Sequence, residues 1–490
     1  MMEKKRNWFC PTKWLVAVAL LLVIGDLGYS FYQHYHYPMD GDMEESVLPR
    51  DCMKPLYEDP FGVKMLATHE PHAAPNRFFS HYLLYKTYRT VPFALQHFVE
   101  PLQSVYLTNA ICKTLMQVAL LLLLCALVCG GFRFKEPRFY LAMLLFAPLF
   151  QTCGAVRSFG LIDPSLTYAF FYALPLIFLV CCLLPFIYEE FFGRKFLSNS
   201  VLRTVFFLFF LMLTCFSGAI NTAITLVLIL TLSIRFTVNY ILDNTLEKKS
   251  LDSFFKAVPK HYWLYLLPIG LLSLYSFWLG TFNTMWGSQH LPLADRYRMF
   301  STGFLMMFQE KPFVIFFALS VLNFAIIRIF IPQKGKVPVQ LFLWINVFAL
   351  IYMALLPFGG YRPYRPFIIR YDVMIAVSFL YIFYLVHSTI FLIEHIPQNV
   401  VRIPYLIGCL AFMIYFTVID KPLLWDNYIE IAAIRKIQES TETPVVLTVP
   451  ATVVSWFPAY SVEDSKNVSE ILYIWHITDT PKPFYCQKEE

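Results

Sequence analysis

The chain has 490 residues, of which 58% are hydrophobic and 15% are charged, and it carries a formal net charge of +6 at pH 7. This composition excludes an ordinary soluble domain. The hydrophobic residues occur in long blocks, and about 18 to 22 such residues cross roughly 30 Å of hydrocarbon. The excess of basic residues falls mainly in loops assigned below to the cytoplasm, so it does not indicate a nucleic-acid partner. The sequence therefore predicts an all-α polytopic membrane protein.

Hydrophobic blocks suggest eleven transmembrane helices. The first block contains Asp26, has no small-residue cleavage site after it and ends in aromatic residues typical of a membrane interface, so we expect an uncleaved anchor. The predicted spans are residues 14–32, 109–131, 139–153, 166–187, 201–217, 219–239, 262–280, 313–331, 338–357, 371–393 and 404–420.

Basic residues fix the expected orientation. The N-terminal residues Lys4, Lys5, Arg6 and Lys13 favour the cytoplasm, and alternation from there gives every inward loop a basic character. The expected organisation is a cytoplasmic N-terminus (1–13), the anchor (14–32), an extracytoplasmic loop (33–108), a transmembrane bundle (109–420) and an extracytoplasmic C-terminal region (421–490).

The outward regions are expected to contain short helices. Phe78, Tyr82, Tyr85 and Tyr88 recur at helical spacing in the first loop, as in helices that lie in the interface with their apolar side in lipid. In the C-terminal region, residues 428–439 resemble an amphipathic helix. A predicted strand at 444–455 then indicates a small α/β appendage.

An acidic segment follows the anchor closely, at residues 40–45 (DGDMEE). A carboxylate of Asp40 or Asp42 held near the bilayer is suited to deprotonate a hydroxyl, and the pair is also suited to hold a divalent cation such as Mg²⁺ or Mn²⁺. Glu44, Glu45 and the outward Asp163 are candidate supporting acids. The alternative is an ordinary solvated acidic loop.

Arginines concentrate in the outward loops, against the usual charge bias of membrane proteins. Their guanidinium groups are expected at headgroup depth, where they can bind a lipid phosphate through paired hydrogen bonds. The alternatives are ordinary anionic headgroups or an ion pair with Asp372. The candidate phosphate ligands are Arg362, Arg365 and Arg370 in the segment 359–372, Arg296 and Arg298 in 281–312, and Arg157.

Cysteine and histidine patterns indicate no metal site. Most cysteines lie inside hydrophobic blocks, and the histidines of the first loop fit no zinc spacing. Cys52 and Cys486 are both expected outside the membrane, which makes them a candidate disulfide pair.

The architecture resembles the GT-C class of polytopic glycosyltransferases. The matching residues are Asp40-Gly41-Asp42 and, in the second outer loop, Asp163. The stretch 40–49, with residues 59–62 and 75–79, also resembles uncharacterised bacterial inner-membrane proteins. The second outer loop has no full D-x-D and the chain has no W-W-D motif, so protein N-glycosylation is not expected.

The resemblance to GT-C enzymes implies a function. It implies transfer of a sugar from a polyprenyl-phosphate carrier to a glycan or lipid acceptor outside the bacterial inner membrane. Asp40 or Asp42 would be the general base, and Arg362, Arg365 or Arg370 would stabilise charge on the leaving phosphate.

Two other functions remain open. O-antigen polymerases and ligases also use outward arginines, but they usually place their largest outer loop late in the chain. A transporter or a non-enzymatic scaffold is the third reading, although transporters tend to show paired repeats, and none is visible here.

Overall fold

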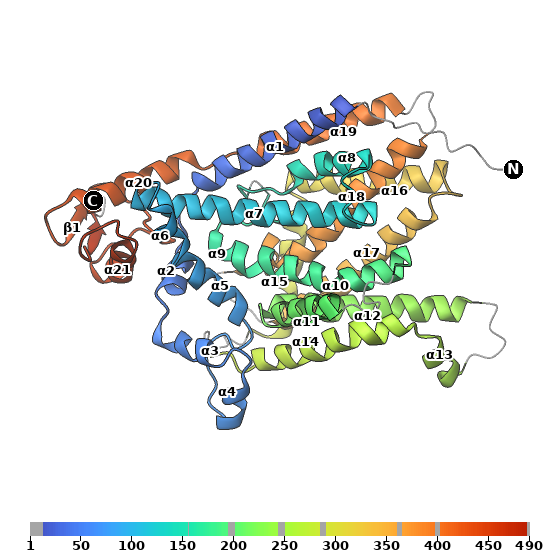
Figure 1. The fold of residues 1–490 in the computed structure, drawn as a ribbon, viewed down its shortest axis with the longest axis horizontal. Coiled ribbons are helices and arrows are strands. Elements are labelled where there is room, and N and C mark those ends of the chain that lie inside the picture. The colour runs from blue at the N-terminus through green and yellow to red at the C-terminus, as the bar shows by residue number, and fades with distance from the viewer. Residues whose placement is uncertain are drawn as a thin grey trace.

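The computed structural model describes residues 13–154, 156–194, 201–243, 250–284, 291–359, 365–396 and 402–487. Long helices lie side by side in a bundle, and short helices and a two-stranded sheet gather at one end of it (Figure 1). The predicted all-α polytopic class is confirmed at this level.

Nine helical stretches among the described residues are long and apolar enough to cross a membrane. The predicted spans 139–153 and 201–217 coincide with shorter apolar helices, at Pro137–Leu149 and Val201–Cys215. The exact number of crossings therefore stays a prediction. The long elements are α1 (Lys13–Tyr35), α7 (Pro101–Cys129), α9 (Leu166–Tyr168) continuing through η3 (Ala169–Ala173) into α10 (Leu174–Phe192), α12 (Ala219–Leu242), η4 (Tyr262–Leu266) with α14 (Leu267–Gly280), α16 (Lys311–Phe330), α17 (Lys336–Leu355), α18 (Tyr371–His395) and α19 (Arg402–Ile419).

The remaining elements are short. Those that belong to the long apolar region are α8 (Pro137–Phe146), η2 (Ala147–Leu149), α11 (Val201–Cys215), α13 (Leu251–Ala257) and η5 (Leu356–Gly359). The first outer loop contains α2 (Asp42–Val47), η1 (Asp51–Met53), α3 (Lys54–Glu58), α4 (Val63–Thr68), α5 (Phe78–Tyr88) and α6 (Val91–Leu95). Beyond them are α15 (Leu293–Met307), α20 (Leu424–Glu439), β1 (Val445–Leu447), η6 (Glu463–Ser465), α21 (Lys466–Ile474) and β2 (Phe484–Cys486).

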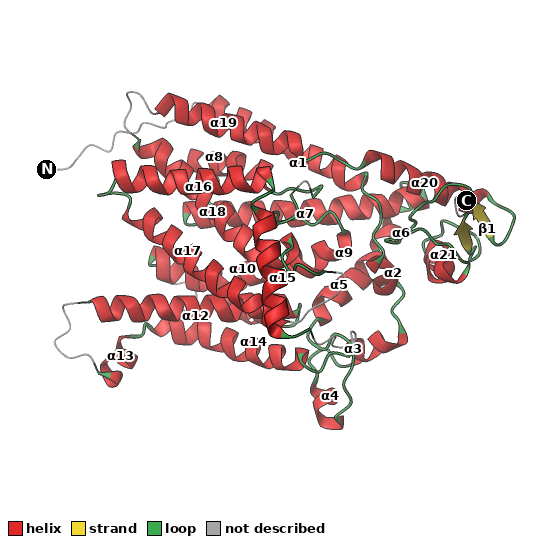
Figure 2. Cartoon of the chain, turned by 180° about the vertical axis from the view of Figure 1, so that it is seen from behind, coloured by secondary structure: helices red, strands yellow, loops and turns green. Residues whose placement is uncertain are grey.

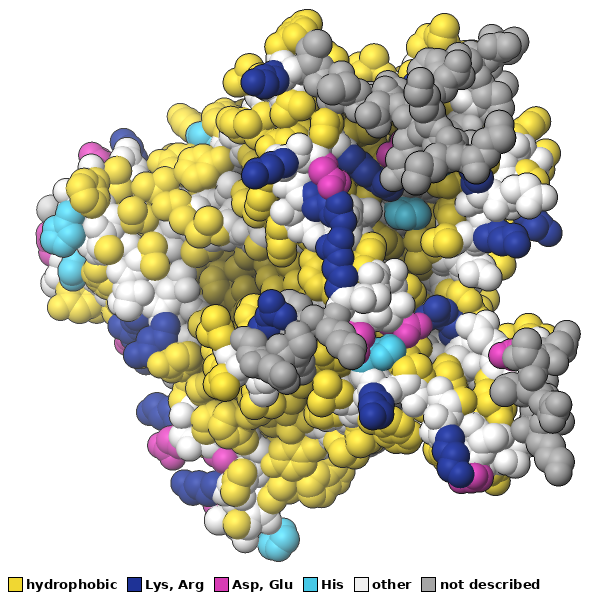
Figure 3. Space-filling view, turned by 45° about the vertical axis from the view of Figure 1, so that its right-hand side comes forward, with side chains coloured by type: hydrophobic (Ala, Val, Ile, Leu, Met, Phe, Trp, Pro, Cys, Tyr) yellow, Lys and Arg dark blue, Asp and Glu magenta, His cyan; other side chains and the backbone are white. Residues whose placement is uncertain are grey.

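The helices differ in how much hydrophobic surface they leave uncovered. The most apolar window of α18 is 78% buried, whereas that of α1 is only 11% buried. Helices are suited to the membrane interior because they satisfy their backbone hydrogen bonds internally, as hydrocarbon requires. Figure 3 shows broad hydrophobic areas on the side of the molecule and a hollow among them lined by hydrophobic side chains. We therefore assign the exposed apolar flanks to lipid.

The short elements lie at two opposite ends of the bundle, and the connecting segment that contains an element decides which end it occupies. The helices α2 to α6 lie at the same end as β1 and α21, and α13 lies at the other end (Figure 1). This distribution agrees with alternating crossings, while the end that faces the cytoplasm remains a prediction. Helix α15, from the predicted outward region 281–312, crosses the long helices at a steep angle (Figure 2).

The predicted interfacial helix at residue 78 exists, but protein covers part of its apolar stripe. Leu84 and Tyr88 of α5 are fully buried. The Tyr88 ring lies 5.9 Å from the Trp475 ring between centroids. The Trp475 indole N–H donates to the carbonyl oxygen of Tyr88 at 3.2 Å. The stripe therefore packs in part against the C-terminal region, where we had expected only lipid.

The C-terminal region contains a parallel pair of strands, with Val445 opposite Phe484. The predicted strand at 444–455 is shorter than expected and covers only β1. Cys52 is exposed and Cys486 is buried in β2, and both are free thiols. The candidate disulfide between them is therefore not formed in this structure.

Glu430 attaches this region to the bundle. This side chain of α20 is fully buried. One carboxylate oxygen accepts hydrogen bonds from the Met39 backbone N–H at 3.0 Å and the Tyr106 hydroxyl at 2.6 Å. The other accepts from the Val454 backbone N–H at 3.1 Å. One carboxyl group thus joins the first outer loop, α7 and the C-terminal region.

Replacing Glu430 with Gln should remove a pH dependence of stability. Burial raises the pKa of Glu430 from 4.5 to about 7. Between these two pH values the folded chain holds a proton that the unfolded chain has released, so this contribution to the free energy of unfolding falls as the pH rises. This contribution is greatest below pH 4.5 and levels off above 7, a loss of about 3 kcal/mol. Thermal unfolding in detergent between pH 4 and 8 measures it.

The exposed Glu439 on the same helix supplies the control for this comparison. The unfolding temperature of wild type should fall with pH relative to Glu430→Gln, and Glu439→Gln should follow wild type. Parallel curves for wild type and Glu430→Gln would contradict the assignment.

Candidate functional site

Asp40 connects the acidic segment to the second outer loop. Its side chain is only 2% exposed. It accepts hydrogen bonds from the Thr167 hydroxyl at 2.7 Å and the Thr167 backbone N–H at 3.1 Å. The first turn of a helix has backbone N–H groups without intrahelical partners, and Asp40 satisfies one of them in α9. Burial raises the pKa of Asp40, and the hydrogen bonds from Thr167 oppose that effect.

Asp42 has a more open position. It begins α2 and is only partly buried. One carboxylate oxygen accepts a hydrogen bond from the indole N–H of Trp456 at 3.2 Å. The Asp42 backbone N–H donates to Asp40 at 3.2 Å. The two carboxylates are therefore adjacent, but Asp40 is engaged with α9, while among the described residues Asp42 accepts from one side-chain donor.

Gly41 lies between the two acids and is in close contact with Trp456. Its backbone is helical, with φ −70° and ψ −19°, so a residue with a side chain could adopt it. A Cβ atom there would lie 2.7 Å from the Trp456 backbone nitrogen. The glycine is thus required by the close approach of Trp456.

The supporting acids are already paired. Glu44 accepts a hydrogen bond from the Asn467 side chain at 2.6 Å. Glu45 forms a 2.6 Å ion pair with Arg50. Asp163 is buried and accepts from the Ser165 backbone N–H at 2.8 Å. These contacts give all three acids positions in the outer loops.

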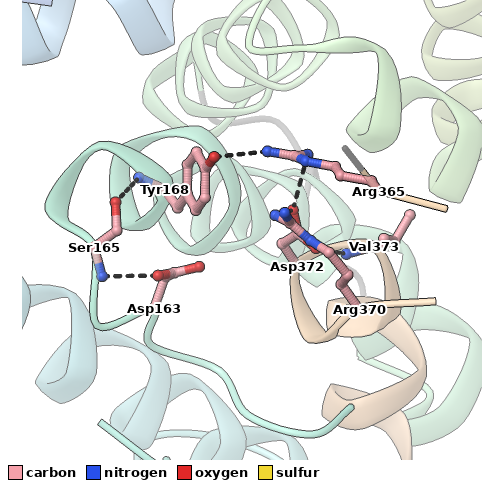
Figure 4. Close-up of polar contacts among 7 residues, drawn as sticks. All are labelled: Asp163, Ser165, Tyr168, Arg365, Arg370, Asp372 and Val373. Carbon is pink, nitrogen blue, oxygen red and sulfur yellow. Dashed lines mark hydrogen bonds and ion pairs between the residues drawn. The ribbon is translucent and has the colours of Figure 1, made fainter. Parts of the chain in front are cut away.

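Arg365 and Arg370 share the buried carboxylate of Asp372 (Figure 4). Arg370 donates from Nε at 3.0 Å and also from Nη2, and Nη1 of Arg365 lies 3.6 Å from the same group. Asp372 is 1% exposed, whereas the arginine side chains are 19% and 31% exposed. The pairing with Asp372 left open by the sequence is therefore present. Two guanidinium groups on one carboxylate leave an excess positive charge at an accessible surface.

Tyr168 joins these arginines to the acidic segment. Its hydroxyl accepts a hydrogen bond from Nη2 of Arg365 at 2.6 Å. Both guanidinium carbons lie 5.4 Å from its ring centroid, within the range of a cation–π contact. Its ring centroid is 6.0 Å from that of Trp456, which donates to Asp42. We call Tyr168, Arg365, Arg370 and Asp372 the arginine–tyrosine cluster.

The other predicted phosphate ligands have different surroundings. Arg296 donates to the carbonyl oxygens of Leu291 at 2.8 Å and Pro357 at 3.3 Å. Arg298 is exposed and pairs with Asp295 on its own helix. Arg157 is exposed, and Arg362 lies outside the described residues. The structure thus brings Arg365 and Arg370 together near the acidic segment.

The surroundings of Asp40 and Asp42 do not fit a divalent cation. Both oxygens of Asp40 accept hydrogen bonds from the protein. Within the described ranges, no group of three or more His, Cys, Asp or Glu side chains is arranged to hold a metal. Hard divalent cations require six or more oxygen ligands, several of them usually carboxylates.

Three important residues were not predicted from the sequence. Tyr168 lies in a hydrophobic block and Trp456 in the C-terminal region, and neither has a local signal. Lys113 was recognisable, because a lysine inside a predicted span is costly in lipid. It is fully buried in α7, donates to the Pro164 carbonyl oxygen at 2.5 Å and lies 5.0 Å from the Tyr37 ring centroid.

Comparisons with protein-family models, with curated proteins and with solved structures found no match to this chain.

Replacing Gly41 with Ala should displace Trp456 and lower stability by about 1 to 3 kcal/mol, as overpacking does. The reason is the close approach of Trp456 to Gly41. Thermal unfolding in detergent measures the loss, and Trp456 fluorescence, isolated by subtracting a Trp456→Phe spectrum, reports its displacement. Gly28→Ala in α1 is the matched control, since nothing lies within 4 Å of its added Cβ. Equal stability of the two variants would show that the contact is not tight.

Proposed function

We propose that the chain is a GT-C-like integral membrane glycosyltransferase. It moves a sugar from a polyprenyl-phosphate donor to a glycan or lipid acceptor on the extracytoplasmic face. The observation that carries this proposal is the connection of Asp42 through Trp456 and Tyr168 to Arg365 and Arg370. A carboxylate and an excess of positive charge thus adjoin the same aromatic pair.

The arginine–tyrosine cluster is suited to a lipid phosphate. A guanidinium group binds phosphate oxygens through paired donors, and it does so more strongly where water is partly excluded. Asp372 keeps both arginines in place, while their partial exposure leaves donors accessible. This excess positive charge would stabilise the phosphate most in the transition state, when the phosphate gains negative charge.

Asp42 is the better candidate for the general base. Asp40 accepts hydrogen bonds from Thr167 and Asp42 and is almost fully buried, so a hydroxyl substrate has little access to it. Asp42 is partly exposed, and its one side-chain donor is the neutral indole of Trp456. A base must come within hydrogen-bond reach of the proton that it removes. Asp40 would then position the segment that carries Asp42.

The proposed reaction is a single displacement. The acceptor hydroxyl gives its proton to Asp42 while its oxygen forms a bond to the anomeric carbon of the sugar. The bond from that carbon to the phosphate oxygen breaks, and its electron pair leaves with the polyprenyl phosphate. Arg365 and Arg370 stabilise the charge that develops there. The hydrophobic hollow in the side of the bundle offers an apolar surface for the polyprenyl tail (Figure 3).

Asp42→Asn should lower the turnover of polyprenyl-phosphate sugars by about 10² to 10⁴, the usual contribution of a general base. Arg365→Gln and Arg370→Gln should each lower it by about 10² to 10³ through lost charge stabilisation. The full chain in liposomes is assayed with radiolabelled polyprenyl-phosphate hexoses and pentoses and cell-envelope glycans and lipids, with released polyprenyl phosphate as the readout.

Arg298→Gln is the matched control, because Arg298 is exposed and forms an ion pair with Asp295 on its own helix. It should retain wild-type turnover. Full activity in Asp42→Asn would exclude Asp42 as the base. Absence of turnover and of polyprenyl-phosphate binding in wild type would reject the proposed function.

A further inference from the structure

A polar pocket lies inside the predicted membrane region, separate from the arginine–tyrosine cluster. It is small, with room for about one water-sized ligand, and lies between α1, α7, the turn after α8 and the end of α19. Its polar lining includes Asp26, Ser30, Gln117, Gln151, Thr152 and Asp420. Ionisable groups in a membrane span are costly and usually have a function, so this lining requires an explanation.

Asp420 is fully supplied with donors. Its carboxylate accepts hydrogen bonds from the Thr152 backbone N–H at 2.8 Å, the Thr152 hydroxyl at 2.9 Å and the Cys153 backbone N–H at 2.8 Å. Three donors favour the ionised form of a carboxyl group. The buried Lys113 also interacts electrostatically with Asp420 and offsets its negative charge.

Asp26 has no such support. It lines the pocket from the middle of α1 and is partly buried. Among the described residues, no side-chain hydrogen bond or ion pair of the protein reaches its carboxylate, and its electrostatic neighbour is Asp420, of like charge. A charged group in hydrocarbon without a counter-ion is strongly unfavourable. Such a group is neutralised either by a proton or by a cation that enters the pocket.

Two buried glutamines also line this space. Gln117 is 1% and Gln151 is 2% exposed. Their amide nitrogens donate elsewhere, Gln117 to the Ser30 hydroxyl at 3.1 Å and Gln151 to the carbonyl oxygens of Pro148 and Phe416. Within the part of the chain that the structure describes, neither side-chain oxygen has a hydrogen-bond partner.

The orientation of Gln151 is well determined, because reversing its amide would place oxygen against two carbonyl oxygens. Its backbone has φ 56°, a left-handed conformation that is unfavourable for a residue with a side chain. Such a conformation persists where the surrounding structure requires it. Here it accompanies a buried amide oxygen at the wall of the pocket.

We infer that this pocket binds a monovalent metal cation, with Na⁺ as the probe. The ligands are oxygens of Asp26, Gln117 and Gln151, and Asp420 contributes its charge nearby. Carboxylate and amide oxygens suit a hard cation. A single positive charge suffices to balance the carboxylate of Asp26, while Lys113 acts on the neighbouring Asp420. This inference is independent of the proposed glycosyl transfer.

The bound cation would fasten the outer half of α1 to α7 and the turn after α8. Gln33, one helical turn beyond Ser30, already donates to the carbonyl oxygen of Asp420. The chain continues from α1 into the acidic segment within a few residues. Occupancy of the pocket would therefore steady the segment that carries Asp42.

The test is thermal unfolding of the purified full chain in detergent at increasing NaCl, with choline chloride holding ionic strength constant. Wild type should show a saturable rise in unfolding temperature that choline does not produce, because a ligand specific to the folded state stabilises it. Asp26→Asn should weaken the apparent Na⁺ affinity at least tenfold. Asp51→Asn, an exposed carboxylate in the first loop, is the control and should behave as wild type.

Equal unfolding temperatures in NaCl and choline chloride would overturn the inference. If, in addition, only lower pH stabilised the chain, the pocket would take a proton instead of a cation. An unchanged Na⁺ response in Asp26→Asn would also overturn it. Should Asp26→Asn fail to fold, the Na⁺ response of Gln117→Leu and the binding of ²²Na⁺ to wild type test the same inference. Turnover enters none of these measurements, so their failure is distinct from failure of the proposed function.

Discussion

Buried carboxylates that accept backbone N–H groups from distant segments hold one end of this bundle together. Asp40 binds the first turn of α9, Asp420 binds residues 152 and 153, and Glu430 binds Met39 and Val454. Removing such an acceptor leaves a buried backbone N–H unsatisfied, which is unfavourable. Loops that would otherwise have little core of their own therefore acquire fixed positions. The arrangement of the candidate site depends on this constraint.

The constraint also separates two acids that look equivalent in sequence. Asp40 is engaged by the helix end it supports, so its neighbour Asp42 retains the accessible carboxylate. A similar division occurs among the basic residues, where Asp372 binds both arginines of one cluster while Arg296 supports the position of α15. In each case one charged group positions the backbone, and another remains available for a ligand. The same pattern would be expected of an O-antigen polymerase or ligase, so the reaction product is what separates these enzyme classes.

Much of the bundle was predictable because hydrophobic blocks of membrane length have few other structures available to them. The contacts that join the acidic segment to Arg365 and Arg370 were not predictable, since they depend on Tyr168, an aromatic residue like many others in a hydrophobic block. Covering of Tyr88 by Trp475 was equally hidden, because periodicity shows that a helix face is apolar without showing whether lipid or protein covers it. The glycine at position 41 is required by the approach of Trp456, a residue more than 400 positions away in the sequence.

Charge balance connects the pocket inside the membrane with the surface site. Lys113 lies fully buried and interacts electrostatically with Asp40, Asp163 and Asp420, so one cation serves several acids at the end of α7. It cannot compensate them all, and Asp26 is the acid with the least support from the protein. With a cation at Asp26, Lys113 would act on Asp40, which belongs to the acidic segment, and on Asp163. Interactions between charges are strong where water is scarce. Filling the pocket would thus alter the electrostatic environment of the outer loops without any direct contact to them.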